Sequence, residues 1–488
     1  MLCAAMVLTS CTIGSASATQ QPASSVQFLG HLGRWLTNSE GDVVVLHGMN
    51  MVYKRPPFTP EAAGFGDVAA KVLEDEGLDV VRLGVIYSAV EPSPGTFDRS
   101  YLDSIASTVS VLAHHGVYTL LDFHQDMMTQ AFGGEGFPSW SVETDGLPEK
   151  SFVFPLAYTQ SPALDAAFDN FWSDRPGPGG VGLQERYASA WRFVAERFAG
   201  DPYVLGYDLF NEPWPANSTA SELAAFYSKV ISSIRSVDKR HLIFYEPFVT
   251  FNFGVQTELP RITGDPLGMS FHDYCLQNSL QEEAQCAQQE TSTVENALMR
   301  SAATGDALVL SEFGATTDQQ DLGRVVAIAD RSELPWIEWA YCGCEDPTGS
   351  IPPSIEALVY DPRLPAAGTN VDEATLHTLV EPYPRIVAGT PLSYGYVSKT
   401  HTFEITYSTT APDGRHLDRG CSVIVVPALQ YPNGYDVEVS GGRVVSSPRS
   451  GTLDVVAREG ASAVTVRVTQ GSDGSPSDPG PSVSCANG

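Results

Sequence analysis

The stretch VLGYDLFNEP, residues 204–213, decides the fold of this chain. It begins with an almost continuous apolar run, which is typical of a strand buried on both faces of a parallel sheet. Asn211, Glu212 and Pro213 end that run, and these residue types are uncommon in strands. A buried strand that stops at such residues indicates a strand end at which side chains are available for chemistry.

Seven further runs of this kind recur between residues 43 and 342. They are VVVLHGMNMV (43–52), DVVRLGVIY (79–87), VYTLLDFHQD (117–126), HLIFYEP (241–247), GMSFHDYC (268–275), ALVLSEFG (307–314) and WIEWAYC (336–342). Amphipathic helical patterns, such as YLDSIASTVSVLAHHG (101–116), separate the runs. Eight strands that alternate with helices predict an α/β fold, a (β/α)8 TIM barrel.

The runs end with polar or aromatic side chains able to do chemistry. These residues are Asn50, Arg82, His124, Asn211, Glu212, Glu246, His272, Tyr274, Glu312 and Trp339. Because the C-terminal ends of barrel strands surround the active site, we expect these side chains to share one site. Glu212 and Glu312 end the fourth and seventh runs, and glycoside cleavage requires two carboxyl groups across the scissile bond. The alternative is that each Glu is a solvated loop residue.

The pattern changes after EPYPRIVAGTP, residues 381–391. Short alternating strands follow in FEITYSTT (403–410), CSVIVVPAL (421–429), YDVEVSGG (435–442) and SAVTVRVTQ (462–470). This pattern predicts a separate C-terminal β-sandwich domain. We therefore predict a signal and linker segment at 1–25, the catalytic barrel at 26–388 and the sandwich at 389–488.

The first 25 residues have the composition of a targeting segment, with a short apolar stretch followed by small and polar residues. Within them LTSC, residues 8–11, resembles a bacterial lipobox, in which Cys11 would be lipidated. No Lys or Arg precedes Arg34, so the basic region that begins such segments is missing. We expect an exported protein, either a cell-surface lipoprotein anchored through Cys11 or a secreted one.

Composition excludes some partners. The chain carries 58 Asp and Glu against 28 Lys and Arg, a formal charge of -30 at pH 7. This balance argues against a nucleic-acid partner and against electrostatic docking on anionic membranes. No apolar run reaches the roughly 20 residues of a membrane-spanning helix. We expect a monomer that meets the membrane surface through its substrate or a lipid anchor.

Cysteine usage agrees with export. Six cysteines lie beyond the N-terminal segment, and their spacing does not fix the pairing. Cys275 and Cys286 are the first pair we expect, because they would close a short loop. A zinc site is disfavoured, since the chain lacks the paired Cys and His spacings of such sites.

A long insertion, residues 127–203, separates the third and fourth runs. Insertions of this size at the active-site end of a barrel are more often functional than idle. Its apolar side chains include Met127, Met128, Phe132, Phe137, Trp140 and Phe154. These side chains could shelter a lipid, or they could pack a small core of the insertion itself.

Several motifs in order resemble glycoside hydrolase family 5. The motifs are FNEPW (210–214), SFHDYC (270–275), LSEFG (310–314) and WAY (339–341), and together they cover the whole barrel. GMNMVYKRPP (48–57), DFHQD (122–126), NEPWP (211–215), SEFGAT (311–316) and PYPRIVAGTP (382–391) are also similar to the endoglycoceramidase branch. Members of that branch also carry a C-terminal β-sandwich.

The resemblance implies a role for each matched residue. Glu312 would be the nucleophile and Glu212 the general acid/base, with carboxyl groups about 5 to 5.5 Å apart as in retaining enzymes. Asn211 would hold the sugar 2-hydroxyl. Arg82 and Tyr274 would flank Glu312 and keep it ionised, because a nearby cation lowers a carboxyl pKa.

Other residues would complete the sugar site. His272 would tune Glu212, His124 would bond a sugar hydroxyl, and Trp339 would form an apolar floor for the sugar face. Three charged residues just beyond strand ends are weaker candidates for outer sugars: Lys54, Asp126 and Glu246. For these three, a solvated loop position is the alternative.

The implied activity is that of a retaining endo-β-glycosidase. It would cleave the bond between oligosaccharide and ceramide in glycosphingolipids and would release both parts intact. No cofactor is implied, because two carboxyl groups suffice for the chemistry. The alternatives are another family 5 β-glycosidase, either an endoglucanase or a steryl glucosidase, and a non-catalytic glycan-binding surface protein.

Overall fold

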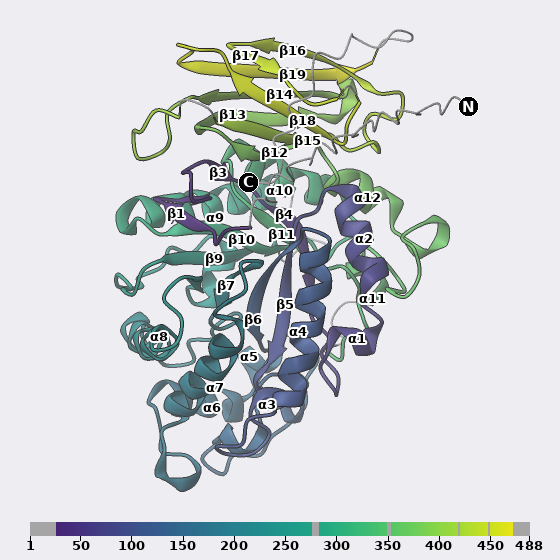
Figure 1. Ribbon diagram of the computed structural model, residues 1–488. Coiled ribbons are helices and arrows are strands. Elements are labelled where there is room, and N and C mark those ends of the chain that lie inside the picture. The colour runs from purple at the N-terminus through teal and green to yellow at the C-terminus, as the bar shows by residue number, and fades with distance from the viewer. Residues whose placement is uncertain (1–25, 276–282, 349–352, 418–419, 448, 472–488) are drawn as a thin grey trace, which may run out of the picture.

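The computed structural model describes residues 26–275, 283–348, 353–417, 420–447 and 449–471. Eight parallel strands close into a barrel, and antiparallel sheets pack against one end of it (Figure 1). The barrel strands are β4 (His47–Met51), β5 (Val80–Ile86), β6 (Tyr118–His124), β7 (Val204–Asp208), β8 (Leu242–Tyr245), β9 (Leu267–Asp273), β10 (Ala307–Phe313) and β11 (Trp336–Glu338).

The barrel confirms the predicted TIM-barrel class. Its strand order is β10-β11-β4-β5-β6-β7-β8-β9, which is sequence order around a closed ring. Each of the eight apolar runs contains one barrel strand. The first run is divided, because Val43 and Val44 form β3 of an antiparallel sheet before the barrel strand β4 begins at His47. Continuous apolar sequence therefore spans two sheets at that point.

Helices surround the barrel. They are α1 (Pro60–Ala63), α2 (Asp67–Glu76), α3 (Tyr87–Val90), α4 (Arg99–His114), α5 (Ala157–Gln160), α6 (Pro162–Trp172), α7 (Leu183–Phe198), α8 (Ala220–Arg235), α9 (Glu283–Thr304), α10 (Gln319–Arg331), α11 (Pro353–Glu356) and α12 (Glu373–Leu379). Helix α8 begins at a capping box, in which the Thr219 side chain accepts from Glu222 N and the Glu222 side chain accepts from Thr219 N. This cap ends the loop that carries Glu212.

The insertion after β6 packs mainly against itself. Phe137 is 3% exposed and lies within 5.7 Å, between ring centroids, of Phe171, Tyr187 and Phe210. Met127, Met128 and Phe132 are fully buried in the same core, and the Trp140 indole donates to the Glu91 carbonyl oxygen at 3.2 Å. Most of the apolar side chains in the insertion thus form its own core, and the idea that Phe137 and Trp140 shelter a lipid is wrong. Phe154 differs, because it lines the active-site cavity.

Two antiparallel sheets, formed by strands after the barrel and by three short strands before it, confirm the predicted C-terminal β-sandwich. One contains β1 (Gly30–Leu32), β2 (Trp35–Thr37), β3 (Val43–Val44), β12 (Tyr383–Val387), β15 (Cys421–Val425), β18 (Thr452–Ala457) and β17 (Gly442–Val444). The other contains β13 (Thr390–Val397), β14 (Thr402–Ser408), β19 (Ala463–Gln470) and β16 (Tyr435–Ser440). The proposed domain limits at 25/26 and 388/389 stay predictions.

The sandwich contacts the N-terminal ends of the barrel strands. The Tyr383 ring stacks on His47, the first residue of β4, with centroids 3.8 Å apart. The Tyr383 hydroxyl lies 2.8 Å from Asp79 Oδ2, directly before β5. Leu36 of β2 is fully buried in a cluster with Leu120 and Leu205 at the same end. The C-terminal strand ends therefore face away from the sandwich, where a substrate can approach.

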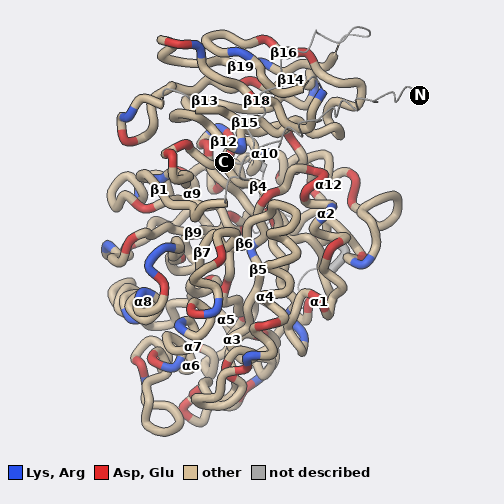
Figure 2. Tube along the Cα trace, viewed as in Figure 1, with Lys and Arg blue, Asp and Glu red and all other residues tan. Residues whose placement is uncertain are grey.

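The remaining features of the fold are its charged residues, its disulfides and its hydropathy. Acidic residues are distributed along the chain in both the barrel and the sandwich (Figure 2). A disulfide joins Cys275 to Cys286, as predicted, and a second one joins Cys342 to Cys344. Within the described ranges, no helix is long and apolar enough to cross a bilayer. The lipobox cysteine, Cys11, lies outside the described residues.

Candidate active site

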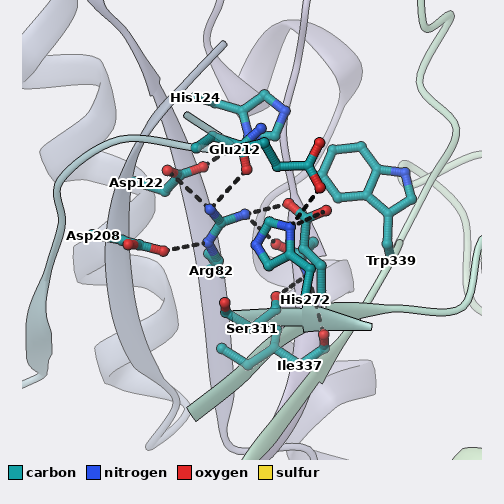
Figure 3. Close-up of polar contacts among 12 residues, drawn as sticks. Arg82, Asp122, His124, Asp208, Glu212, His272, Ser311, Ile337 and Trp339 are labelled. Carbon is teal, nitrogen blue, oxygen red and sulfur yellow. Dashed lines mark hydrogen bonds and ion pairs between the residues drawn. The ribbon is translucent and has the colours of Figure 1, made fainter. Parts of the chain in front are cut away.

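Arg82, on β5, is the centre of the site. Its side chain is fully buried, and its guanidinium is surrounded by oxygen atoms from neighbouring strands (Figure 3). The acceptors are Asp208 Oδ2 at 2.9 Å, Asn211 Oδ1 and Glu246 Oε1 at 3.0 Å, Asn50 Oδ1 at 3.2 Å and Glu312 Oε1. Asp122 Oδ1 forms an ion pair with the same guanidinium at 3.1 Å. Burial alone would lower the pKa of Arg82, but the carboxylates raise it well above its ordinary value.

Glu312 lies near the end of β10 and points into the barrel mouth. Its Oε1 bonds Arg82, and its Oε2 accepts from the Tyr274 hydroxyl at 3.1 Å. The β9–β10 pairing shifts register between Leu310 and Glu312, which marks a local irregularity next to this side chain. Glu312 is 4% exposed, so little water reaches its carboxylate. A cation and a hydroxyl donor hold the carboxylate in this buried position.

Glu212 follows β7 on a strained turn. Its φ of 45° lies in the left-handed region, which is unusual for a residue other than glycine and recurs at functional sites. Oε1 accepts from Asn252 Nδ2 at 2.8 Å and lies 2.9 Å from His272 Nδ1. Burial raises the pKa of Glu212, and the contact with His272 offsets part of that increase.

The two glutamates face each other across His272. One ligand atom from each of Glu212, His272 and Glu312 lies within 4.8 Å of the others. His272 Nδ1 is also 3.4 Å from Glu312 Oε2, and Nε2 is 3.3 Å from Glu246 Oε1. Burial opposes a charged imidazolium, but the carboxylates raise the pKa of His272 well above its ordinary value. The spacing of the two carboxyl groups suits a retaining glycosidase.

The weaker candidates are buried within or beside the same site. Lys54 and Asp126 are 5% and 4% exposed and are joined by an ion pair of 2.6 Å. Glu246 is 2% exposed, and besides Arg82 its Oε2 accepts from Glu212 N at 2.8 Å. A solvated-loop position is therefore wrong for all three. Glu246 contacts Arg82 and the Glu212 backbone, next to the pair of Glu212 and Glu312.

His124 and Trp339 form a stacked pair at the cavity wall. Their ring centroids are 5.2 Å apart, and both residues line the cavity. His124 Nδ1 lies 2.8 Å from Asp122 Oδ2, whereas Nε2 has no hydrogen-bond partner among the described residues. Nε2 lies 3.6 Å from Asp126 Oδ2, so both imidazole nitrogens face carboxylates of the site.

The cavity above these residues has a volume of about 490 Å³. Its polar lining includes Lys54, His124, Asp126, Asp346 and Glu356, and its apolar lining includes Phe154, Pro155, Leu156, Tyr158, Trp214, Val249 and Phe253. In the ring, β11 lies opposite β7 and β4 lies opposite β8. The loops after β4 and β11 carry Lys54, Asp346 and Glu356, so they face Trp214 after β7 and Val249 after β8. We call the wall around Lys54, Asp346 and Glu356 the polar side and the wall around Leu156, Trp214 and Val249 the apolar side. Acidic residues after β10, Asp318 and Asp321, also line the cavity.

Three residues of the site were not predicted from the sequence. Asn252 lies in the short helix η4 (Val249–Phe253), and Asp346 and Glu356 lie in the segment after β11. None of them ends an apolar run, so the pattern that found the others gives no signal here. An Asn inside the aromatic run FVTFNF (248–253) was the only local hint.

Three groups of described residues could in principle hold a metal ion. They are His124, Asp126 and Glu135; Glu212, His272 and Glu312; and Cys286, Glu290 and Asp321. Lys54 bonds Asp126, Arg82 bonds Glu312, and Arg324 bonds both Glu290 and Asp321. Each group thus already has a cationic side chain of the protein as its partner.

Comparison with known proteins agrees with this geometry. A model of the cellulase domain of glycosyl hydrolase family 5 matches residues 38–345, and a model of the family 5 C-terminal domain matches residues 382–469.

The chain belongs to glycoside hydrolase family 5.

Its relatives within family 5 include endoglycoceramidases. Endoglycoceramidase I of Rhodococcus hoagii is 29% identical over 96% of this chain and 93% of its own length. The structure of endo-glycoceramidase II from Rhodococcus sp. as a lactosyl-enzyme intermediate has a TM-score of 0.76 and 28% identity, and it covers 90% of this chain and 100% of that chain. A complex of the same enzyme with ganglioside GM3 gives the same TM-score and identity, and it covers 90% of this chain and 99% of that one.

The contacts of Arg82 predict a large effect on stability in this family 5 barrel. Arg82→Met leaves several buried carboxylates without a cation, so we expect the free energy of unfolding to fall by about 3–5 kcal/mol. Arg82→Lys keeps the charge and should lose less. Arg331→Met, at an exposed position on α10, is the matched control and should unfold like the unmodified protein. Urea denaturation followed by circular dichroism measures these free energies of unfolding. The same free energy of unfolding for Arg82→Met and Arg82→Lys would contradict the account.

Proposed function

We propose that this protein is a retaining endo-β-glycosidase that hydrolyses the bond between oligosaccharide and ceramide in glycosphingolipids. The observation that carries the proposal is the pair of buried carboxyl groups, Glu212 and Glu312, placed within 4.8 Å at the mouth of the barrel. The relationship to endoglycoceramidases over nearly the whole chain supports the ceramide aglycone. A glycosphingolipid is therefore the substrate class we assign.

The local environments divide the two roles. Arg82 and Tyr274 stabilise the ionised carboxylate of Glu312, so Glu312 attacks the anomeric carbon and forms the glycosyl-enzyme. Burial favours the protonated form of Glu212, which gives its proton to the departing ceramide oxygen. Water then takes the place of ceramide and attacks the anomeric carbon, while Glu212 removes a proton from the water. The bond between the sugar and Glu312 breaks, and the glycan leaves with retained configuration. Asn211 lines the cavity beside the pair, where it would contact the sugar 2-hydroxyl.

Substitution of the two glutamates separates these roles. Glu312→Gln should abolish hydrolysis of every substrate, whereas Glu212→Ala should keep activity on aryl glycosides whose leaving groups need no acid. The kcat/KM of the unmodified enzyme should decline as rising pH removes the Glu212 proton, and the raised pKa moves that decline above the range of an exposed Glu. Glu212→Ala should lack this alkaline decline on activated aryl glycosides. Substantial activity of Glu312→Gln would contradict the assignment of the nucleophile.

The apolar side of the cavity would receive the ceramide. Leu156 lines the cavity while 45% exposed, and Phe154 and Trp214 line it with Leu156. About 0.8 kcal/mol is gained for each CH2 group removed from water, so a few methylenes outweigh a typical neutral hydrogen bond of about 1 kcal/mol. These side chains replace Phe137 and Trp140 as the proposed lipid contacts.

Leu156→Ser should therefore lower kcat/KM on lactosylceramide about tenfold while changing kcat/KM on an aryl lactoside little. Leu392→Ser alters an exposed leucine on β13 of the sandwich, 57% exposed, and is the matched control. Equal losses on the two substrates would show that Leu156 does not contact the lipid. That result would favour an endoglucanase or a steryl glucosidase, whereas inactivity of the unmodified protein on all glycosides would favour a glycan-binding protein.

We also propose that the protein is exported and held at the cell surface through a lipid on Cys11, or is otherwise secreted as a monomer. The support is the LTSC motif and the disulfide between Cys275 and Cys286, a bond typical of exported proteins. The protein made in a bacterial host should enter the detergent phase of a Triton X-114 partition, and Cys11→Ser should move it to the aqueous phase. An unmodified protein found only in the aqueous phase would contradict the anchor.

A further inference from the structure

The polar side of the cavity contains two carboxyl groups that the hydrolysis does not use. Asp346 and Glu356 both lie in the segment after β11, and both line the cavity next to Lys54 and Trp339. The Asp346 side chain is 7% exposed, and Glu356 is 7% exposed. Acidic side chains are seldom this buried unless something binds them.

Lys54 links Asp346 to the sugar site. Its ammonium group lies 2.6 Å from Asp126 Oδ2 and 2.8 Å from Asp346 Oδ2, and it lies 4.6 Å from the centroid of the Trp339 ring. The nearby cation His124 is likewise paired, with Asp122. Both cations on this side of the cavity already have carboxylate partners, so an anionic ligand finds no unpaired cation there.

Glu356 has an oxygen that lacks a partner. Its Oε2 accepts from Trp339 Nε1 at 3.0 Å, whereas Oε1 is buried and has no hydrogen-bond partner among the described residues. A buried acceptor without a donor is unfavourable. A hydroxyl group of a ligand on the Trp339 ring would supply that donor.

We propose that Asp346 and Glu356 complete a sugar subsite around Lys54 and Trp339 that binds a neutral hexose through its hydroxyl groups and disfavours a hexose carrying sulfate or carboxylate. The inference rests on the proposed function, because it assigns this side of the cavity to the glycan. Glu356 accepts a hydroxyl through Oε1 and holds the Trp339 indole through Oε2. Asp346 fixes Lys54, so that the remaining donor of the ammonium group can point to the sugar.

Binding without turnover tests this subsite. Lactose is titrated into Glu312→Gln by calorimetry, alone and with Glu356→Gln or Asp346→Asn added. Either added substitution should weaken the affinity about tenfold or more, because each removes a hydrogen bond that involves a charged group. Glu356→Gln still offers an oxygen to the Trp339 indole, so the Trp339 ring should keep its position. Glu338→Gln, which changes a buried carboxyl on β11 that does not line the cavity, is the matched control and should leave the affinity unchanged.

Lactose analogues identify the contact itself. We expect one of the lactoses that each lack a single hydroxyl to bind Glu312→Gln more weakly than lactose does. The affinity of that analogue should not fall further when Glu356→Gln is added. Lactose with a sulfate on its outer sugar should bind more weakly than lactose. Any of four results would overturn the subsite: unchanged affinity in both added variants, equal losses of affinity for every analogue, tighter binding of the sulfated sugar, or no lactose binding. Failure of the proposed function would instead appear as intact lactose binding without hydrolysis of any glycoside by the unmodified enzyme.

Discussion

A single buried guanidinium organises the catalytic end of this barrel. Arg82 reaches Asp122 at the end of β6, Asp208 at the end of β7, Glu246 after β8 and Glu312 on β10. These acids would repel one another without the cation, and their charged forms would be unfavourable in a site that excludes water. Because the contacts come from four strands, the same ion cluster ties the barrel mouth together and sets the position of Glu312, the proposed nucleophile. Structure and catalysis thus depend on one side chain.

The two glutamates differ because their surroundings differ. Glu312 bonds a cation and a phenol, whereas Glu212 is buried against Asn252 and His272 and keeps a raised pKa. The strained backbone at Glu212 holds that carboxyl opposite Glu312. Beyond the pair, the cavity divides into a polar side and an apolar side, as a substrate with a glycan at one end and a lipid at the other requires. The proposed chemistry and the proposed aglycone therefore depend on different parts of the same cavity.

Much of this arrangement could be predicted from the sequence, because strands buried on both faces are continuous apolar runs. The eight runs gave the barrel, and the residues near their ends gave Glu212 and Glu312 as one site. Arg82 is instead the third residue of β5, and its guanidinium contacts Glu312 and Asn211. Asn252, Asp346 and Glu356 could not be found this way, since they lie in loops whose path depends on tertiary packing. Phe137 was misjudged for a related reason, because composition does not tell whether an aromatic side chain faces a ligand or its own core.

The most direct test of the central claim is to identify the residue that carries the glycosyl group. An activated 2-deoxy-2-fluoro lactoside slows the breakdown of a glycosyl-enzyme, so that peptide mass spectrometry can locate the sugar. The account predicts one added sugar per chain on Glu312, within the peptide that contains LSEFG, residues 310–314. A label on another carboxyl group, or hydrolysis that inverts the anomeric configuration with no label, would contradict it.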